Sequence, residues 1–200
     1  MALTFPLSCP SFFQLLPIKE ITFDCPEVLA TTRTKGGEIL TADNGERLWQ
    51  GEITLGQITR AELSRVRPLI NLLRGMGSFL IFDPIRPFPQ ADANGALLSG
   101  FVPTISALVS NRELSITGLP PGYKLCRDDM LSFRYAANPT RYALHEVVSD
   151  ATASAGGNIT AMEVNPPIRA GATVGTAVTL TRPICKAMIV PDSHRAGRSN

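Results

Sequence analysis

The stretch from Arg47 to Pro89 constrains the fold most, because it has the pattern of a strand, a helix and a second strand in a row. In its first part, residues 47–55, Trp49, Ile53 and Leu55 alternate with mainly polar residues. This alternation is typical of a strand with one side on a core. The stretch ends in three prolines, which fix φ and remove amide donors, so we expect the sheet to stop there.

A helix is predicted over residues 60–74. Thr59 and Glu62 have the spacing of a capping box, and apolar residues recur every three or four positions after them. Pro68 lies inside this pattern and removes a hydrogen bond at a cost of about 3 kcal/mol. We therefore expect a kink there, or two short helices in tandem. The next residues, Ser78–Phe82, are apolar and aromatic enough to predict a short buried strand.

The composition favours a β-rich fold with many turns, since glycine and proline supply 16 residues each out of 200. The net charge is +2, with 18% charged residues, so no polybasic surface is evident and no nucleic-acid binding is expected. The first twenty residues lack a basic segment, and no apolar run approaches the ~20 residues of a membrane helix. We expect a soluble chain without membrane insertion.

The first 90 residues predict a small antiparallel sheet system that carries the helix. Residues 1–17 form a proline-interrupted arm, and strands are expected at Ile18–Asp24 and Glu27–Arg33. Gly36-Gly37 predicts a turn, and Asp43-Asn44-Gly45 predicts a hairpin turn that leads into the Trp49 strand.

Short apolar strands separated by turn residues follow Gln90. Six are predicted, at residues 104–109, 113–117, 124–126, 131–135, 141–148 and 158–164. Their spacing of about ten residues suggests a compact barrel or sandwich.

The last two predicted strands, at residues 173–181 and 185–190, are expected to return to the first sheet. The expected division is therefore one domain of residues 1–90 and 168–191, an inserted domain of residues 96–165, and a flexible tail of residues 192–200.

No constellation of residues predicts a reaction, so we expect no catalytic residue, no metal site and no cofactor. His145 and Glu146 are neighbours in a predicted strand and point to opposite faces, while His194 lies in the tail. Asp128-Asp129 is interpreted as a solvated turn. The four cysteines form no CxxC pair and are expected to be free thiols. No GxSxG, P-loop, GxGxxG or HExxH motif occurs.

Taken in order, these segments resemble the distal tail proteins and related tail-tip proteins of long-tailed bacteriophages and of related prophages. The matching points are LWQGEITLG, the helix that ends in LLRGMG, and the strand SFLIFDP with its prolines. Later come YKLCRDDMLSFRY and ITAMEVNPPIRAGATVGTAVTLTRP. The resemblance covers nearly the whole chain, rests on pattern and order, and departs from the family at Pro68.

The resemblance implies a tail-tube-like antiparallel β-sandwich with one flanking helix, plus an inserted small β-barrel or sandwich domain. It implies a structural virion protein, made in the host bacterial cytoplasm, that forms a hexameric or trimeric ring. Such a ring joins the tail tube to the proteins of the baseplate hub or tip. Some tail-tip relatives hold an iron–sulfur cluster, which the dispersed cysteines here do not support.

The subunit interface is expected in the arm and in the hairpin region, because a ring needs complementary surfaces on its two sides. The candidate interface residues are Phe5, Phe12, Phe13, Gly36, Gly37, Asn44, Gly45 and Trp49. For Trp49, a core anchor, a subunit contact and a sugar platform all stay open.

Two other functions remain open. One is a carbohydrate- or receptor-binding module, which would need exposed aromatic residues among Tyr123, Phe133, Tyr135 and Tyr142. The other is a small hydrolase of the tail tip, for which no Cys/His or Glu/His pair is found.

Overall fold

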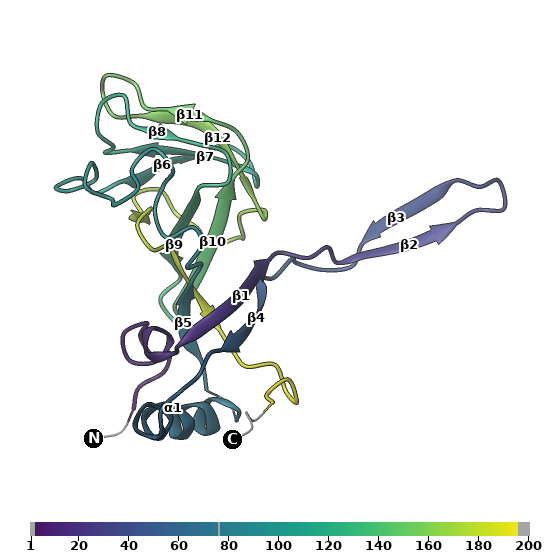
Figure 1. Cartoon of the computed structure of the whole chain (residues 1–200). Coiled ribbons are helices and arrows are strands. Elements are labelled where there is room, and N and C mark those ends of the chain that lie inside the picture. Colours follow the sequence, from purple (N-terminus) through teal and green to yellow (C-terminus); the bar gives the residue numbers. More distant parts are fainter. Residues whose placement is uncertain (1–2, 76, 196–200) are drawn as a thin grey trace. The chain divides into compact units, whose positions relative to one another are not determined.

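The structure is a computed structural model that describes residues 3–75 and 77–195 (Figure 1). The chain is mainly β, as predicted, and the described residues contain one α-helix. They divide into two compact units, one formed by residues 17–57 and the other by the remaining residues. We describe each unit by itself.

Residues 17–57, which we call the ribbon, form a long two-stranded antiparallel arrangement (Figure 1). Its four strands are β1 (Ile18–Asp24), β2 (Leu29–Arg33), β3 (Ile39–Asp43) and β4 (Gln50–Leu55). β1 pairs with β4, and further out β2 pairs with β3. The chain therefore runs out along one side of the ribbon and returns along the other.

The predicted hairpin turn at Asp43-Asn44-Gly45 is wrong. The chain reverses at residues 34–38 instead, where the Gly37 amide donates to the Thr34 carbonyl oxygen at 3.0 Å. Gly37 has φ 86°, a conformation that glycine adopts without steric cost. The Asn44 amide donates across the ribbon to the Val28 carbonyl oxygen at 2.9 Å, so Asn44 lies in the break between the two ladders.

The helix of the second unit, α1 (Arg60–Leu73), begins with the predicted capping box. The Glu62 amide donates to Thr59 Oγ1 at 3.3 Å, and the Thr59 amide donates back to Glu62 Oε2 at 2.9 Å. Val66 and Leu73 are buried. The expectation of two helices in tandem is wrong, because the helix continues through Pro68.

A short three-stranded arrangement follows the helix in this unit. β5 (Phe79–Phe82) pairs with β14 (Ile184–Ala187) on one side, and Leu7 bridges to Phe79 on the other. The short 3-10 helix η1 (Phe13–Leu15) packs on β5. Distant parts of the sequence thus meet around β5.

The rest of this unit is a six-stranded antiparallel sheet with the order β13-β9-β10-β12-β7-β6. Its strands are β6 (Thr104–Leu108), β7 (Glu113–Thr117), β9 (Met130–Tyr135), β10 (Arg141–Val147), β12 (Ile159–Asn165) and β13 (Val178–Thr179). The two ends of this order meet, since the Val178 amide donates to the Pro103 carbonyl oxygen at 2.8 Å. The sheet is therefore a nearly closed barrel, and β8 (Lys124–Leu125) and β11 (Ala151–Thr152) pair separately.

The barrel encloses the main apolar core of the described residues. Ile105, Leu114, Ile116, Leu125 and Leu131 are each no more than 1% exposed. Burying a side chain of this size stabilises a fold by about 1.5–3 kcal/mol. The barrel thus carries its own source of stability.

The final strands separate from each other. β14 pairs with β5, whereas β13 pairs with β9 of the barrel. The expectation that residues 173–181 return to the first sheet is wrong, because Val178 and Leu180 are buried in the barrel core.

The wider domain assignment stays a prediction: residues 1–90 with 168–191, and an inserted domain of residues 96–165. Of the predicted tail, residues 192–200, only 192–195 fall within the described residues.

An ion-pair cluster joins the proline-rich segment after β5 to the barrel. Arg86 Nε donates to Asp83 Oδ2 at 2.7 Å, and Arg86 also pairs with Asp128 and lies 3.7 Å from Glu146 Oε2. The Asp83 side chain is 2% exposed, so water has little access to its ion pair with Arg86, and salt weakens this pair less than an exposed one. Glu146 is held in turn by the Asn165 side-chain amide at 2.6 Å.

Candidate assembly surface

The outer part of the ribbon, β2 and β3, has no core of its own. All five residues of β2 are exposed, on both faces of the hairpin. Leu29 and Ile39 lie on one face at 42% and 57% exposed, and Leu40 lies on the other at 48%. An isolated two-stranded hairpin is marginal in water, and a partner that covered these exposed apolar side chains would add buried apolar area.

The inner part of the ribbon has two unlike faces. Ile21, Phe23, Ile53 and Leu55 are half-buried and share one face, while the opposite face is polar and exposed. Trp49 stacks on Phe23, with ring centroids 5.2 Å apart and planes 17° from parallel. Trp49 therefore anchors the apolar face of the ribbon.

The candidate residues of the arm have different surroundings. Phe12 and Phe13 are 3% and 2% exposed, and their rings lie edge-on against Phe79 and Phe82 at 5.0 and 5.3 Å. They pack inside their own unit, so we leave them out of the assembly surface. Phe5 is 45% exposed and remains a candidate.

The hairpin candidates all lie on the ribbon. Gly36 and Gly37 form the turn at its tip, and Asn44 and Gly45 lie in the break between its two ladders. The structure therefore gathers these four residues and Trp49 on one element, although not in a single patch.

Sequence reasoning missed the exposed apolar residues of the ribbon. Leu29, Ile39 and Leu40 lie in threonine-rich segments, and Leu48, which is 57% exposed, lies just before β4. Alternation alone does not show whether a strand has a sheet to cover it. Their exposure follows from the pairing of β2 with β3 alone, which the sequence does not show.

Most aromatic residues proposed as a sugar-binding platform are not accessible. Tyr123, Phe133 and Tyr135 are between 3% and 5% exposed, inside the barrel core. Tyr142 is half-buried. Burial and the nearby Asp92 carboxylate raise the pKa of Tyr123, whose hydroxyl donates to Asp92 Oδ2 at 3.4 Å.

His145 lies inside the barrel and is 2% exposed. Because a carbonyl oxygen can only accept, His145 Nδ1 carries the ring proton and donates a hydrogen bond to Pro166 O at 2.7 Å. The ring stacks on Phe133 with centroids 5.4 Å apart, and Nε2 has no hydrogen-bond partner among the described residues. Burial lowers the pKa of His145 to about 4, so the ring is neutral at pH 7.

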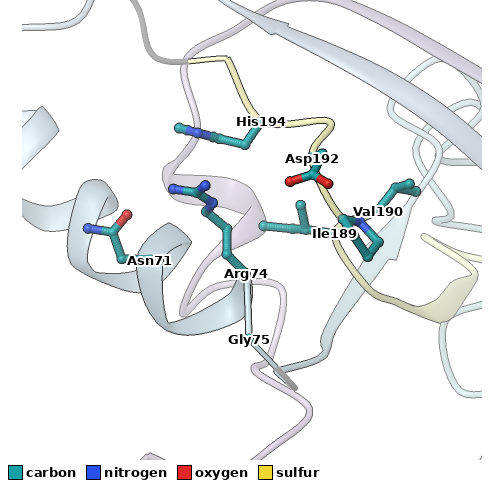
Figure 2. A pocket seen from close by; sticks show the side chains of 8 residues that line it. Asn71, Arg74, Gly75, Ile189, Val190, Asp192 and His194 are labelled. Carbon is teal, nitrogen blue, oxygen red and sulfur yellow. The ribbon is translucent and has the colours of Figure 1, made fainter.

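An open cleft of about 410 Å³ lies beside the C-terminal end of α1. Asn71 and Arg74 line it from the helix, and Asp192 and His194 line it from the returning chain (Figure 2). Figure 2 shows the Arg74 guanidinium and the His194 ring extending toward the same opening. The cleft combines two basic side chains with one carboxylate.

Cys9, Cys126 and Cys185 are free thiols, and Cys9 and Cys185 are buried. Burial raises the pKa of Cys9, whose thiol donates to the Leu80 carbonyl oxygen at 3.3 Å. Burial also raises the pKa of Cys185, to about 12, so both stay protonated at pH 7. Within residues 3–75 and 77–195, no group of three His, Cys, Asp or Glu side chains could hold a metal ion.

Within the same residues, no helix has both the length and the apolar character needed to cross a bilayer. No protein-family model matches the chain, and a search of curated proteins finds no match.

Proposed function

We propose that this chain is a structural subunit that assembles with copies of itself into a ring at the distal end of a bacteriophage tail. The ring would join the tail tube to the baseplate or tip, and the protein would act in the virion without catalysis. The resemblance in segment order to distal tail proteins supplies the biological setting.

The single observation that carries the proposal is the ribbon. It exposes Leu29, Ile39, Leu40 and Leu48 and has unpaired edges on both sides of its two strands. Free strand edges and apolar side chains are the groups that a neighbouring subunit can cover. Because the surface of the ribbon differs from the surface that would receive it, copies would join head to tail, and this geometry generates rings.

The mass of the purified protein in solution, measured by light scattering during size exclusion, tests the proposal. We expect three or six copies of the 21.5 kDa chain and a ring with a central lumen in negative stain. A variant in which residues 29–43 are replaced by a two-residue Asn-Gly turn keeps β1 and β4 and should stay a monomer. A wild-type protein that remains monomeric, both alone and with its tail-tube neighbour, would contradict the proposal.

A carbohydrate- or receptor-binding module of the tail tip is the second candidate. We rank it lower because Tyr123, Phe133 and Tyr135 are buried. A polar cleft of about 510 Å³ beside β11 and β12 is the place where such a ligand would fit, and none of its lining residues is aromatic. Glycan-array binding that is lost in Asn158→Ala would favour this second candidate.

A further inference from the structure

The polar face of the inner ribbon is acidic. Glu20 and Asp24 of β1 and Glu52 of β4 are exposed. They share this face, because Glu52 pairs with Thr22, midway between the other two. The remaining residues of the face, Thr22, Gln50 and Thr54, are uncharged. With a rise of about 3.4 Å per residue, the three carboxylates extend along ~14 Å of the ribbon.

One flank of α1 is basic. Arg60, Arg67 and Arg74 are exposed and seven residues apart, which is two turns, or about 10.5 Å, for each interval. Ser64 and Asn71 lie between them on the same flank and are also exposed. We call these three arginines the arginine stripe.

The arginine stripe has no ion pair with any described residue. At its C-terminal end, Arg74 reaches the cleft that His194 also lines (Figure 2). The other arginine of the helix, Arg65, lies two residues from Arg67, about 200° around the helix axis. Arg65 is exposed. The hydrogen bonds with Thr59 lower the pKa of the Glu62 carboxylate in the capping box, and the positive charge of Arg65 lowers it further.

Charge is divided unequally between the two units. Residues 17–57 contain seven acidic and four basic side chains, a net charge of −3, and the rest of the chain contains ten acidic and 15 basic side chains, a net charge of +5. Three of the four basic side chains of the ribbon, Arg33, Lys35 and Arg47, lie outside the β1–β4 pair, and the fourth, Lys19, is at the register shift of β1 between Ile18 and Glu20. The two units therefore offer surfaces of opposite charge.

We propose that the acidic face of the ribbon in one copy docks on the arginine stripe of a neighbouring copy. This inference rests on the proposed ring and names the pair of surfaces that would form its repeating contact. Each copy has one acidic face and one stripe, so every copy can bind two neighbours, one on each side. Opposite charges across such a contact fix its register and speed association, and the exposed apolar side chains of the ribbon add buried area.

Single charge reversals at neighbouring positions give a matched first test. Arg67→Glu places a carboxylate in the middle of the stripe, whereas Arg65→Glu makes the same change in charge on the other side of the same helix. We expect Arg67→Glu to raise the dissociation constant between copies at least tenfold and Arg65→Glu to change it less than threefold, as measured by light scattering over a dilution series. Equal effects of the two reversals would overturn the docking surface.

Two triple variants test whether the contact forms between copies. One carries Arg60→Glu, Arg67→Glu and Arg74→Glu; the other carries Glu20→Arg, Asp24→Arg and Glu52→Arg. Each should be monomeric alone, with the circular dichroism of the wild type, because all six positions are exposed. Mixed in equal amounts they should assemble, since each variant's ribbon then meets a neighbour's helix of opposite charge.

The outcomes separate this inference from the proposed function. If the wild type forms rings and either triple variant alone does too, the charge pairing is wrong and the ring stands. If the variants stay monomeric after mixing, the pairing is overturned as well. If the stripe instead retains the wild type on heparin or DNA, and the reversals abolish that retention without changing assembly, the stripe binds a polyanion. A wild type that never assembles overturns both proposals.

Discussion

The barrel and the ribbon are both antiparallel β-structure, but the barrel joins the two edges of its sheet, whereas the ribbon keeps two free strand edges. The barrel joins its first and last strands through the amide of Val178 and the carbonyl oxygen of Pro103, and it turns its apolar side chains inward. The ribbon leaves both outer edges unpaired and every β2 side chain exposed. Closure stabilises a fold without partners, whereas an open ribbon is stable only with something to cover it.

The same substitution in the two regions should give the largest contrast. Leu131 is 0% exposed in the barrel core, and Leu131→Ala leaves a cavity there. We therefore expect the free energy of unfolding to fall by about 2–5 kcal/mol. Leu40→Ala, at a position that is 48% exposed, should change the stability of the monomer by less than about 0.5 kcal/mol and weaken assembly instead. Urea unfolding of dilute protein, followed by light scattering at higher concentration, measures both. Equal losses of stability would break the comparison.

Glycine-to-alanine changes in two turns sharpen the comparison further. Gly157 and Gly37 both have positive φ, at 73° and 86°. A Cβ on Gly157 would lie 2.1 Å from the Leu119 carbonyl oxygen, whereas one on Gly37 meets nothing within 4 Å. Gly157→Ala should therefore cost about 2–5 kcal/mol, backbone strain and overpacking together, and Gly37→Ala about 1–2 kcal/mol of strain alone. Urea unfolding for the first and amide exchange of the ribbon for the second are the measurements.

Acid should weaken the barrel through His145. The pKa of this ring falls to about 4 in the folded state from 6.5, so between these values the unfolded chain binds a proton that the barrel does not. Stability is therefore full above pH 6.5 and declines as the pH falls toward 4, by about 3 kcal/mol. Urea unfolding at several pH values checks this decline.

The matched variant for this prediction is His145→Gln, which keeps a donor near Pro166 O and does not titrate. It should lose that part of the pH dependence. A wild-type slope that survives in His145→Gln would assign the acid sensitivity to other groups. The ribbon contains no histidine, so protonation of a histidine should not change the protection of its backbone amides against hydrogen exchange between pH 6.5 and 4.

The smallest effect concerns the helix that carries the arginine stripe. Thr59→Ala removes the hydroxyl that accepts from the Glu62 amide, and it should reduce stability by about 1 kcal/mol. Serine at the same position keeps a capping hydroxyl and is the control. Thermal unfolding measures both variants, and a Ser variant as unstable as the Ala variant would show that the cap is not the cause.

Much of the fold could be predicted from the sequence because its signals are local. The capping box of Thr59 and Glu62 set the start of α1, and alternation set β1. The short apolar runs between turn residues placed β6, β7, β9, β10 and β12 to within a residue, whereas β13 is much shorter than the predicted strand 173–181 and lies in the other sheet. Of the two outcomes predicted at Pro68, two helices in tandem is wrong, since one lost hydrogen bond did not end the helix, and a kink stays a prediction. Asn44-Gly45 misled the prediction, because a strong local turn signal was overridden by the register of a longer ribbon.

The candidate site could be predicted only in outline. Gly36 and Gly37 marked the tip of the ribbon, but Phe12 and Phe13 gave the same apolar signal whether they faced a neighbour or their own unit. The exposure of Ile39 and Leu40 depends on which strands pair, and pairing is a long-range property. The arginine spacing of α1 was visible in the sequence, although its meaning required the opposite charge on the ribbon.

Amide hydrogen exchange of the wild type at two concentrations tests the central claim most directly. In dilute, monomeric protein the barrel amides of β9, β10 and β12 should be strongly protected, while the ribbon amides of β2 and β3 exchange rapidly. At concentrations where the protein assembles, the ribbon amides should gain protection and the barrel amides should change little. Ribbon amides that are as protected in the monomer as those of the barrel would contradict the account.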